Sequence, residues 1–321
     1  MNGARWIETS AVYNNATRGG GGGSEDVLSC VSGIVSILML IYTFVMYWNY
    51  KHLHVAANHV FVFGVLGFDF VNACTTVGCI FARRYESDLT SRQACVACGF
   101  VIQIYSFAEP CFMVIFWLLT LTLMTGEARV PTLANGRGLT VTSAVVVGVA
   151  VFSSILAAGL SYFDTGTQRA WCWVDTTRFT WFCVVFCWMW IFIACVMMLV
   201  SLAVGIFRSH LNRSQKGLLW RRGTLAGLWL FINVVDVLAR CYPNAALLNA
   251  QAFLDPASGF VNAASFLFSE RMIMLNPCGM SAGDEPPLGF TAVLRLNPMT
   301  EREDLLSPLP PDASRYSWRG H

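Results

Sequence analysis

Four carboxylate side chains interrupt long apolar stretches of the sequence: Asp69, Glu109, Asp236 and Asp255. An acid at the centre of a bilayer costs about 2.5–3.5 kcal/mol on insertion scales, so such residues usually face the protein interior and have partners there. No Lys or Arg stands in mid-span, so we expect these acids to lack cationic partners. Two interpretations remain open. The acids either form a polar network or a ligand contact in the bundle core, or bond locally to Ser, Thr and Asn neighbours such as Asn72, Asn233 and Asn262.

Twelve cysteines are present, and most lie within the apolar stretches, where small apolar side chains are expected. Among these are Cys74, Cys79, Cys111, Cys183, Cys187 and Cys195. Cys95 and Cys98 instead lie where the third stretch begins, and Cys172 lies in the connector before the fifth. A disulfide between Cys172 and one of these two would close a long loop and restrict the unfolded chain. No second CxxC and no histidine pair accompanies Cys95–Cys98, which argues against a metal or redox site.

Seven apolar stretches carry these residues: Val27–Trp48, Val60–Phe81, Cys95–Met124, Leu139–Tyr162, Phe179–Phe207, Gly223–Tyr242 and Leu247–Phe268. Each has roughly the 20 residues that a helix needs to cross the hydrocarbon core. The 321 residues are 55% hydrophobic and 12% charged, whereas soluble domains are about a quarter charged. We therefore predict an all-α membrane protein with a seven-transmembrane helix bundle. The net charge of +2 is too small to indicate a nucleic-acid partner.

The placement of lysine and histidine argues against two other kinds of seven-helix protein. A retinal protein needs a Schiff-base lysine in the seventh helix, and the two lysines here are Lys51 and Lys216, both in connectors. A membrane zinc hydrolase needs a cluster of histidines and acids at the membrane face, which the five histidines do not provide. They are His52, His54, His59, His210 and His321. We therefore predict no enzymatic activity, no catalytic residues and no cofactor or metal.

Polar segments flank the bundle, which we place at residues 27–274. Residues 1–26 include a glycine run and predict a flexible extracellular segment, and we expect the first helix to act as its own insertion signal. Residues 275–321 are rich in Pro, Ser, Asp and Glu and predict a disordered cytoplasmic tail. In this tail Cys278 is a candidate for palmitoylation. The tail also holds a candidate acidic dileucine sorting signal, formed by Glu301, Leu305 and Leu306, where an arrestin or an endocytic adaptor would bind.

The orientation is predicted from the connector between the fifth and sixth stretches, whose basic residues have no acid beside them. They are Arg208, Arg213, Lys216, Arg221 and Arg222. Connectors rich in Lys and Arg tend to stay in the cytoplasm, although the counts summed over the two sides are equal. The N-terminus is then outside, where the sequon at Asn15 can be glycosylated and a disulfide can form. We expect a multi-pass protein of the plasma membrane.

Several short motifs resemble the cyclic-AMP-receptor-like (class E) family of G-protein-coupled receptors. The most specific is Trp171-Cys172-Trp173-Val174 followed by Arg178-Phe179, at the entry to the fifth stretch. The others are Cys95 with Gly99-Phe100, Gln103 and Ser106-Phe107-Ala108, the acid Asp69, Arg240 at the end of the sixth stretch, and Gly259-Phe260 with Ala263–Phe268 in the seventh. The likeness covers roughly residues 58–270. Asp236 and Asp255-Pro256 depart from the family pattern, so cyclic AMP is not carried over as the ligand.

The resemblance implies a receptor that binds an extracellular ligand and activates a cytoplasmic heterotrimeric G protein. It selects Cys95 over Cys98 as the partner of Cys172, and it makes the basic connector the surface on which the G protein docks. An alternative from another class is an ion- or proton-coupled transporter or channel that uses the four buried acids. Against that alternative, the sequence shows no internal repeat of the kind that many transporters have.

Overall fold

The computed structural model describes residues 22–50, 56–85, 88–125, 136–164, 173–174, 179–207, 213–242 and 244–270. Several residues singled out from the sequence lie outside these ranges. They are Asn15, Cys172, Arg208, Cys278, Glu301, Leu305 and Leu306.

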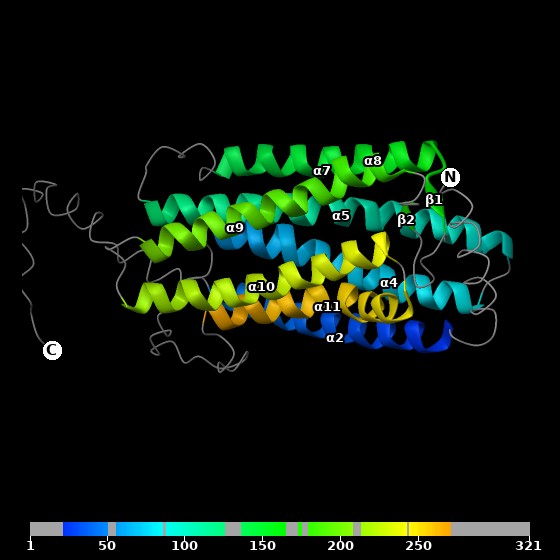
Figure 1. Ribbon diagram of the computed structural model, residues 1–321, viewed down its shortest axis with the longest axis horizontal. Coiled ribbons are helices and arrows are strands. Elements are labelled where there is room, and N and C mark those ends of the chain that lie inside the picture. Colours follow the sequence, from blue (N-terminus) through cyan, green and yellow to red (C-terminus); the bar gives the residue numbers. More distant parts are fainter. Residues whose placement is uncertain are drawn as a thin grey trace, which may run out of the picture.

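Seven long helical segments run side by side in the described part of the chain (Figure 1). Two of them contain a π-helical section that continues directly into α-helix. In chain order the segments are α2 (Gly22–Asn49); α3 (Ala56–His59), η2 (Val60–Leu66) and α4 (Gly67–Tyr85); α5 (Asp88–Thr125); α7 (Gly136–Gly159); α8 (Thr180–Cys183), η3 (Val184–Trp188) and α9 (Met189–Phe207); α10 (Arg213–Cys241); and α11 (Ala245–Ser269). A short antiparallel pair, β1 (Phe163–Asp164) with β2 (Trp173–Val174), connects α7 to α8.

Five of the seven segments are long and apolar enough to cross a membrane, which makes the chain an all-α membrane protein. These spans are Asp26–Asn49, Val60–Ala82, Gln93–Leu121, Gly138–Gly159 and Thr180–Phe207. The remaining two, α10 and α11, carry Asp236, Arg240, Gln251 and Asp255. Two of these four side chains, Arg240 and Gln251, are buried within the protein. The last two helices are therefore less apolar because they contribute polar groups to the interior.

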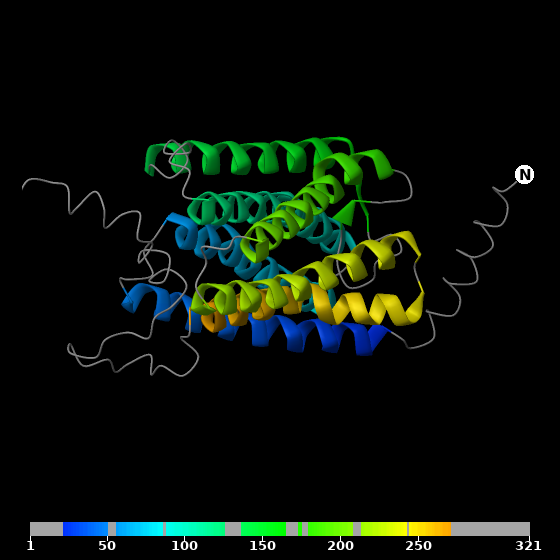
Figure 2. The same cartoon turned by 60° about the vertical axis from the view of Figure 1, so that its left-hand side comes forward.

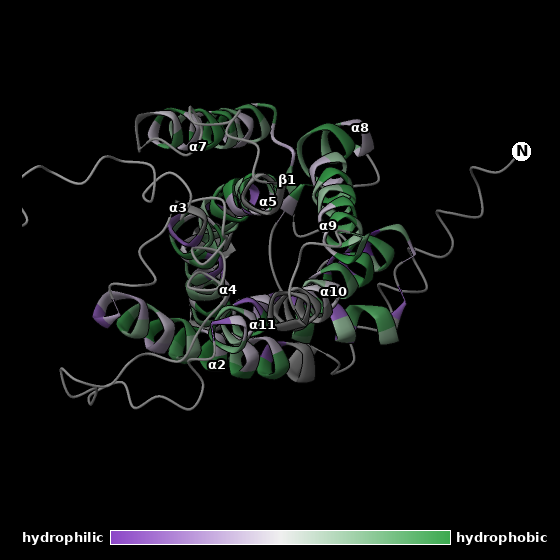
Figure 3. Ribbon diagram, turned by 90° about the vertical axis from the view of Figure 1, so that its left-hand side faces the viewer, coloured by the Kyte–Doolittle hydropathy of each residue, from purple (hydrophilic) through white to green (hydrophobic). Residues whose placement is uncertain are grey.

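Helix α5 lies in the middle of the bundle, between α4, α7 and α9 (Figure 3). Within its span, 72% of the most apolar stretch is buried, against 22% in α7. The large apolar side chains that α7 leaves exposed include Val141, Val145 and Phe152. An exposed apolar face of this extent matches the hydrocarbon of a bilayer, so α7 is a peripheral helix whose outer face contacts lipid.

Helices α2 and α11 pack against each other along much of their length (Figure 2). Gly259 allows a close approach there, because a Cβ atom at this position would lie 2.8 Å from Cδ1 of Leu40. Gly99 does the same on α5, where a Cβ atom would lie 2.8 Å from Cδ1 of Phe163 in β1. Both glycines belong to the motifs of the class E resemblance, and both are needed for backbone packing.

The helix boundaries differ from the sequence expectation at two places. The third helix begins at Asp88 rather than at Cys95, because its first turns are polar and hydropathy does not register them. The sixth begins at Arg213 rather than at Gly223. The basic residues from Arg213 to Arg222 therefore lie in the first turns of α10, and the expectation that they form a connector is wrong.

A disulfide joins Cys79, near the end of α4, to Cys98, near the start of α5, with Cα atoms 6.4 Å apart. The expectation that Cys79 is a free apolar thiol is therefore wrong: its helix end lies beside the first turns of α5. Cys95, one turn earlier on α5, is also disulfide-bonded, and its partner lies outside the described residues. The pairing of Cys95 with Cys172 stays a prediction.

Candidate functional site

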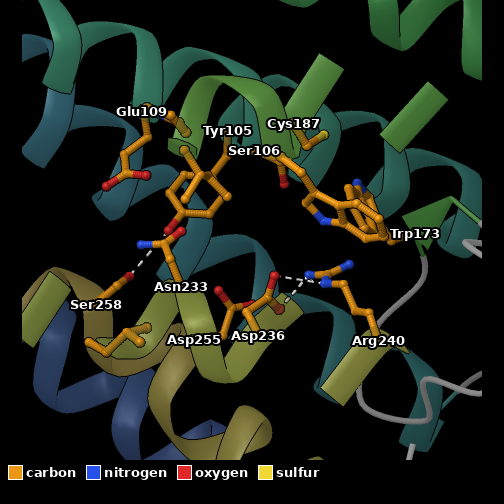
Figure 4. Close-up of a pocket in the computed structure, with 14 residues that line it drawn as sticks. Tyr105, Ser106, Glu109, Trp173, Cys187, Asn233, Asp236, Arg240, Asp255 and Ser258 are labelled. Atoms are coloured by element: carbon orange, nitrogen blue, oxygen red, sulfur yellow. Dashed lines mark hydrogen bonds and ion pairs between the residues drawn. The ribbon is translucent and has the colours of Figure 1, made fainter. Parts of the chain in front are cut away.

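A cavity of about 30 Å³ lies between α5, β2, η3, α9, α10 and α11, in the half of the bundle nearest the disulfide (Figure 4). Its walls combine aromatic rings with charged and amide side chains. The lining residues are Tyr105, Ser106, Glu109, Pro110, Trp173, Cys187, Trp188, Ile191, Ile232, Asn233, Asp236, Arg240, Asp255 and Ser258.

An ion pair on α10 forms one side of the cavity. Arg240 donates from Nε and Nη2 to the two carboxylate oxygens of Asp236, each at 2.7 Å. Gln251 on α11 donates a further hydrogen bond of 2.6 Å to Asp236. The expectation that the acids lack cationic partners is therefore wrong for Asp236, because Arg240 lies four residues on and thus on the same helix face.

Trp173 of β2 covers this ion pair. The guanidinium carbon of Arg240 lies 3.7 Å from the centroid of the Trp173 ring, a cation–π contact. The indole Nε1 of Trp173 donates to Oε1 of Gln103 on α5 at 2.9 Å. The side-chain amide of Gln103 also lies 3.5 Å from Oγ of Ser153 and 3.7 Å from Sγ of Cys187. A single indole thus links the connector before α8 to both α5 and α10.

A second polar network lies deeper in the bundle and contains Asp69 and Glu109. Asn262 on α11 donates to Asp69 at 2.8 Å and lies 3.5 Å from a carboxylate oxygen of Glu109. Ser258 donates to Asp69 at 3.2 Å, and the indole of Trp229 donates to Glu109 at 2.5 Å. All five side chains are at most 3% exposed. Helices α4, α5, α10 and α11 therefore meet through hydrogen bonds at two buried carboxylates.

The hydroxyl of Tyr105 connects this network to the cavity. Its oxygen lies 3.3 Å from that of Ser258, and both residues line the cavity. Glu109 lines the cavity as well, whereas Asp69 reaches it only through Ser258. A molecule in the cavity would thus touch groups that are bonded to both networks.

Asp255 differs from the other three acids because it has no hydrogen bond and no ion pair with any described residue. It lies on α11 directly before Pro256, and it faces the cavity beside Asp236 (Figure 4). The residue as a whole is partly exposed. Of the four acids, this is the one whose oxygens remain available to a molecule in the cavity.

The structure brings together all four acids predicted from the sequence, three of them in the cavity wall and Asp69 behind it. Asn262 bonds to two of them, as the second interpretation allowed, but Asn72 does not: its side-chain amide is buried with no hydrogen-bond partner in the described structure. Asn233 donates to a carbonyl of its own helix.

Four partners were missed: Tyr105, Trp229, Gln251 and Ser258. Trp229, Gln251 and Ser258 each bond to an acid on another helix, and Tyr105 on α5 bonds to Ser258 on α11. The sequence carries no signal for such contacts, because they depend on the mutual rotation of packed helices.

The basic residues of α10 lie far from the cavity. Arg213 and Arg240 are at opposite ends of this helix, which at 1.5 Å per residue separates them by about 40 Å. Arg213, Lys216, Arg221 and Arg222 therefore mark the end of the bundle away from the disulfide. A single rigid helix connects that end to the ion pair in the cavity wall.

Within the described ranges, no group of three or more His, Cys, Asp and Glu side chains is arranged to hold a metal ion. No protein-family model and no curated protein matches the chain.

Proposed function

We propose that the chain is a seven-helix G-protein-coupled receptor of the plasma membrane. An extracellular ligand enters the cavity from the end that carries the disulfide. The first turns of α10, at the opposite end, contact a heterotrimeric G protein in the cytoplasm. This proposal rests on one observation above all: the Asp236–Arg240 ion pair lines a cavity at one end of α10, and the basic run Arg213–Arg222 begins the same helix.

A ligand can signal only if it binds one arrangement of the bundle better than another. The ion pair offers such an arrangement, because Asp236 and Arg240 belong to α10, Gln251 to α11 and Trp173 to the connector. A ligand that competes for any of these contacts alters how α10 is held against its neighbours. A small rotation or tilt at this end of a straight helix displaces the other end.

The disulfides support the proposed orientation. Disulfide bonds form and persist on the oxidising, non-cytoplasmic side of a membrane. Both Cys79–Cys98 and the bond of Cys95 lie at the end where α4 ends and α5 begins. Because α2 runs antiparallel to α4, its N-terminus lies at this end as well (Figure 1). The start of α10 is then cytoplasmic, in agreement with its basic residues.

The test is G-protein nucleotide exchange in membranes that contain the chain and a heterotrimeric G protein, screened against small metabolites. We expect at least one compound to raise exchange, and the triple variant Lys216→Ala/Arg221→Ala/Arg222→Ala to lose this response while it still binds the compound. Phe192→Leu, a change on the lipid-facing side of α9, is the control and keeps the response. Unchanged coupling in the triple variant would remove the G protein from this end of the bundle.

A second candidate, an ion- or proton-coupled transporter, is favoured by the connection of Asp69 and Glu109 through Asn262. Buried carboxylates joined in this way are typical of proton relays in transport proteins. The two candidates differ in proteoliposomes that lack any G protein. A proton or sodium flux that Asp69→Asn abolishes would support the transporter, and impermeable vesicles together with ligand-dependent nucleotide exchange would support the receptor.

A further inference from the structure

Among the charged and indole side chains of the cavity wall, three have a group that lacks a hydrogen-bond partner in the described structure, and these groups differ in what they need. The Nη1 atom of Arg240 and the Nε1 atom of Trp188 are buried donors without an acceptor. The carboxylate of Asp255, which lines the cavity, is an acceptor without a donor among the described residues. Buried polar groups are normally paired, because an unmade hydrogen bond costs the full desolvation of the group. The cavity therefore needs one group that donates and one that accepts.

The charge of the cavity wall determines the sign of the donating group. Arg240 is neutralised by Asp236, with which it makes two contacts of 2.7 Å. Asp255 has no such partner, and Glu109 adds a second acid to the same wall. Because Asp255 makes no ion pair with a described residue, a cation is favoured over an anion beside its carboxylate.

The aromatic side chains of the cavity wall also favour a cation. Tyr105 and Trp188 both line the cavity, and Tyr105 extends with its hydroxyl end towards the side of the cavity that carries Ser258 (Figure 4). The faces of such rings attract ammonium groups, most strongly where water is excluded. The volume of about 30 Å³ limits the occupant to a few heavy atoms.

We propose that this cavity binds a small protonated amine that also carries a hydrogen-bond acceptor. The ammonium group pairs with the carboxylate of Asp255 next to the Tyr105 ring. The acceptor, a hydroxyl, carbonyl or carboxylate oxygen, receives hydrogen bonds from Arg240 and Trp188. This inference deepens the proposed receptor function by naming the ligand class, and it takes from that function only the assumption that the cavity is the ligand site.

Binding is tested directly, by thermal unfolding of the full chain in detergent at neutral pH, with four probes of similar size. Ethanolamine and glycine carry an amine and an acceptor, ethylamine carries the amine alone, and acetate carries the acceptor alone. At concentrations well above Kd we expect ethanolamine or glycine to raise Tm by about 2–4 °C. Ethylamine should raise it less, and acetate should have no effect.

Two variants separate the contributions of the amine and the acceptor. Asp255→Asn should abolish the effect of every amine, and Trp188→Phe should remove the advantage of ethanolamine over ethylamine. Asp26→Asn, which removes an acid at the start of α2, is the charge-matched control and keeps the wild-type response. Because Trp188→Phe conserves the ring and the charge, it tests the acceptor site even where Asp255→Asn does not fold.

The amine could come from a free molecule or from a lipid headgroup, and the membrane composition distinguishes these sources. The test uses nanodiscs of phosphatidylcholine to which phosphatidylethanolamine is added. If the ligand is a lipid headgroup, we expect the added lipid to raise Tm. If the ligand is a free molecule, we expect no change in Tm. Either result supports the amine site. Equal stabilisation by acetate, no response to any amine, or a full amine response in Asp255→Asn would overturn it. Amine binding without nucleotide exchange would leave the site standing and refute the receptor function alone.

Discussion

Ser29 of α2 donates a hydrogen bond of 2.7 Å to the carbonyl oxygen of Ala252 on α11. In an uninterrupted helix that carbonyl would accept from the N–H of residue 256, but residue 256 is a proline and has none. One turn further, Ser36 donates to the carbonyl of Pro256 at 2.6 Å and accepts from the N–H of Phe260 at 3.2 Å. Two serines of α2 thus satisfy the backbone groups around the proline that follows Asp255.

Ser29→Ala should destabilise the protein through Ala252. Its carbonyl would be left buried without a donor, which costs about 1–3 kcal/mol and lowers Tm in detergent. In a Pro256→Ala background the N–H of residue 256 returns, so the cost of Ser29→Ala should fall sharply. This coupling is read from the double-mutant cycle. The control is Ser32→Ala, since Ser32 bonds only to the carbonyl of Ser29 in its own helix. A Ser29→Ala cost that Pro256→Ala does not change would mean that Ser29 acts in another way.

The Asp236–Arg240 pair should show the non-additivity of a buried ion pair. Asp236→Asn and Arg240→Gln each leave one charge without its partner, at a cost of about 3–5 kcal/mol. The double variant removes both charges and should be more stable than either single one. Surface expression and Tm show the order of stability of these variants. Arg240→Lys tests whether the stacking on Trp173 matters beyond charge, because a lysine lacks the planar guanidinium. Additive losses would contradict the pairing.

The helices were predictable from the sequence because length and hydropathy determine a membrane span. Their ends were less predictable. Asp88 and Arg213 begin helices whose first turns are polar, so hydropathy places both starts too late. The Asp236–Arg240 contact could have been read from its spacing of four residues.

The contacts between helices could not be read from the sequence. The pairs Cys79–Cys98 and Glu109–Trp229 each join two helices whose rotation depends on packing around α5. The sequence showed that the buried acids exist, but only the fold shows that Asp69 and Glu109 share Asn262 while Asp255 has no hydrogen-bond partner among the described residues.

The two disulfides, Cys79–Cys98 and the separate bond of Cys95, predict how cysteine variants change stability. Cys79→Ser and Cys98→Ser should each lower stability by about 2–4 kcal/mol, as expected for the loss of a short-loop disulfide, and the double variant should be no worse than either. Cys95→Ser should add to this loss because Cys95 belongs to a separate bond. If Cys95 pairs with Cys172, then Cys172→Ser should lower stability as much as Cys95→Ser does. The variant that carries both changes should then be no less stable than either single variant. Peptide mapping without reduction identifies the partners, and a free thiol at Cys98 would refute the bond to Cys79.

The hydrogen bond between Trp229 and Glu109 should couple α10 to α5. Trp229→Phe removes the indole donor 2.5 Å from Oε1 of Glu109 but keeps a ring in the core. Because a hydrogen bond contributes about 0.5–1.5 kcal/mol net, Trp229→Phe should lower Tm in the wild type and much less beside Glu109→Leu, which removes the acceptor. Glu109→Gln keeps an acceptor oxygen and should preserve most of the effect of Trp229→Phe.

The control for this coupling is Trp117→Phe. Trp117 is a buried indole on α5 whose Nε1 has no hydrogen-bond partner in the described structure, so the cost of Trp117→Phe should not depend on residue 109. If the two tryptophan variants respond equally to Glu109→Leu, the coupling comes from general packing and not from this hydrogen bond.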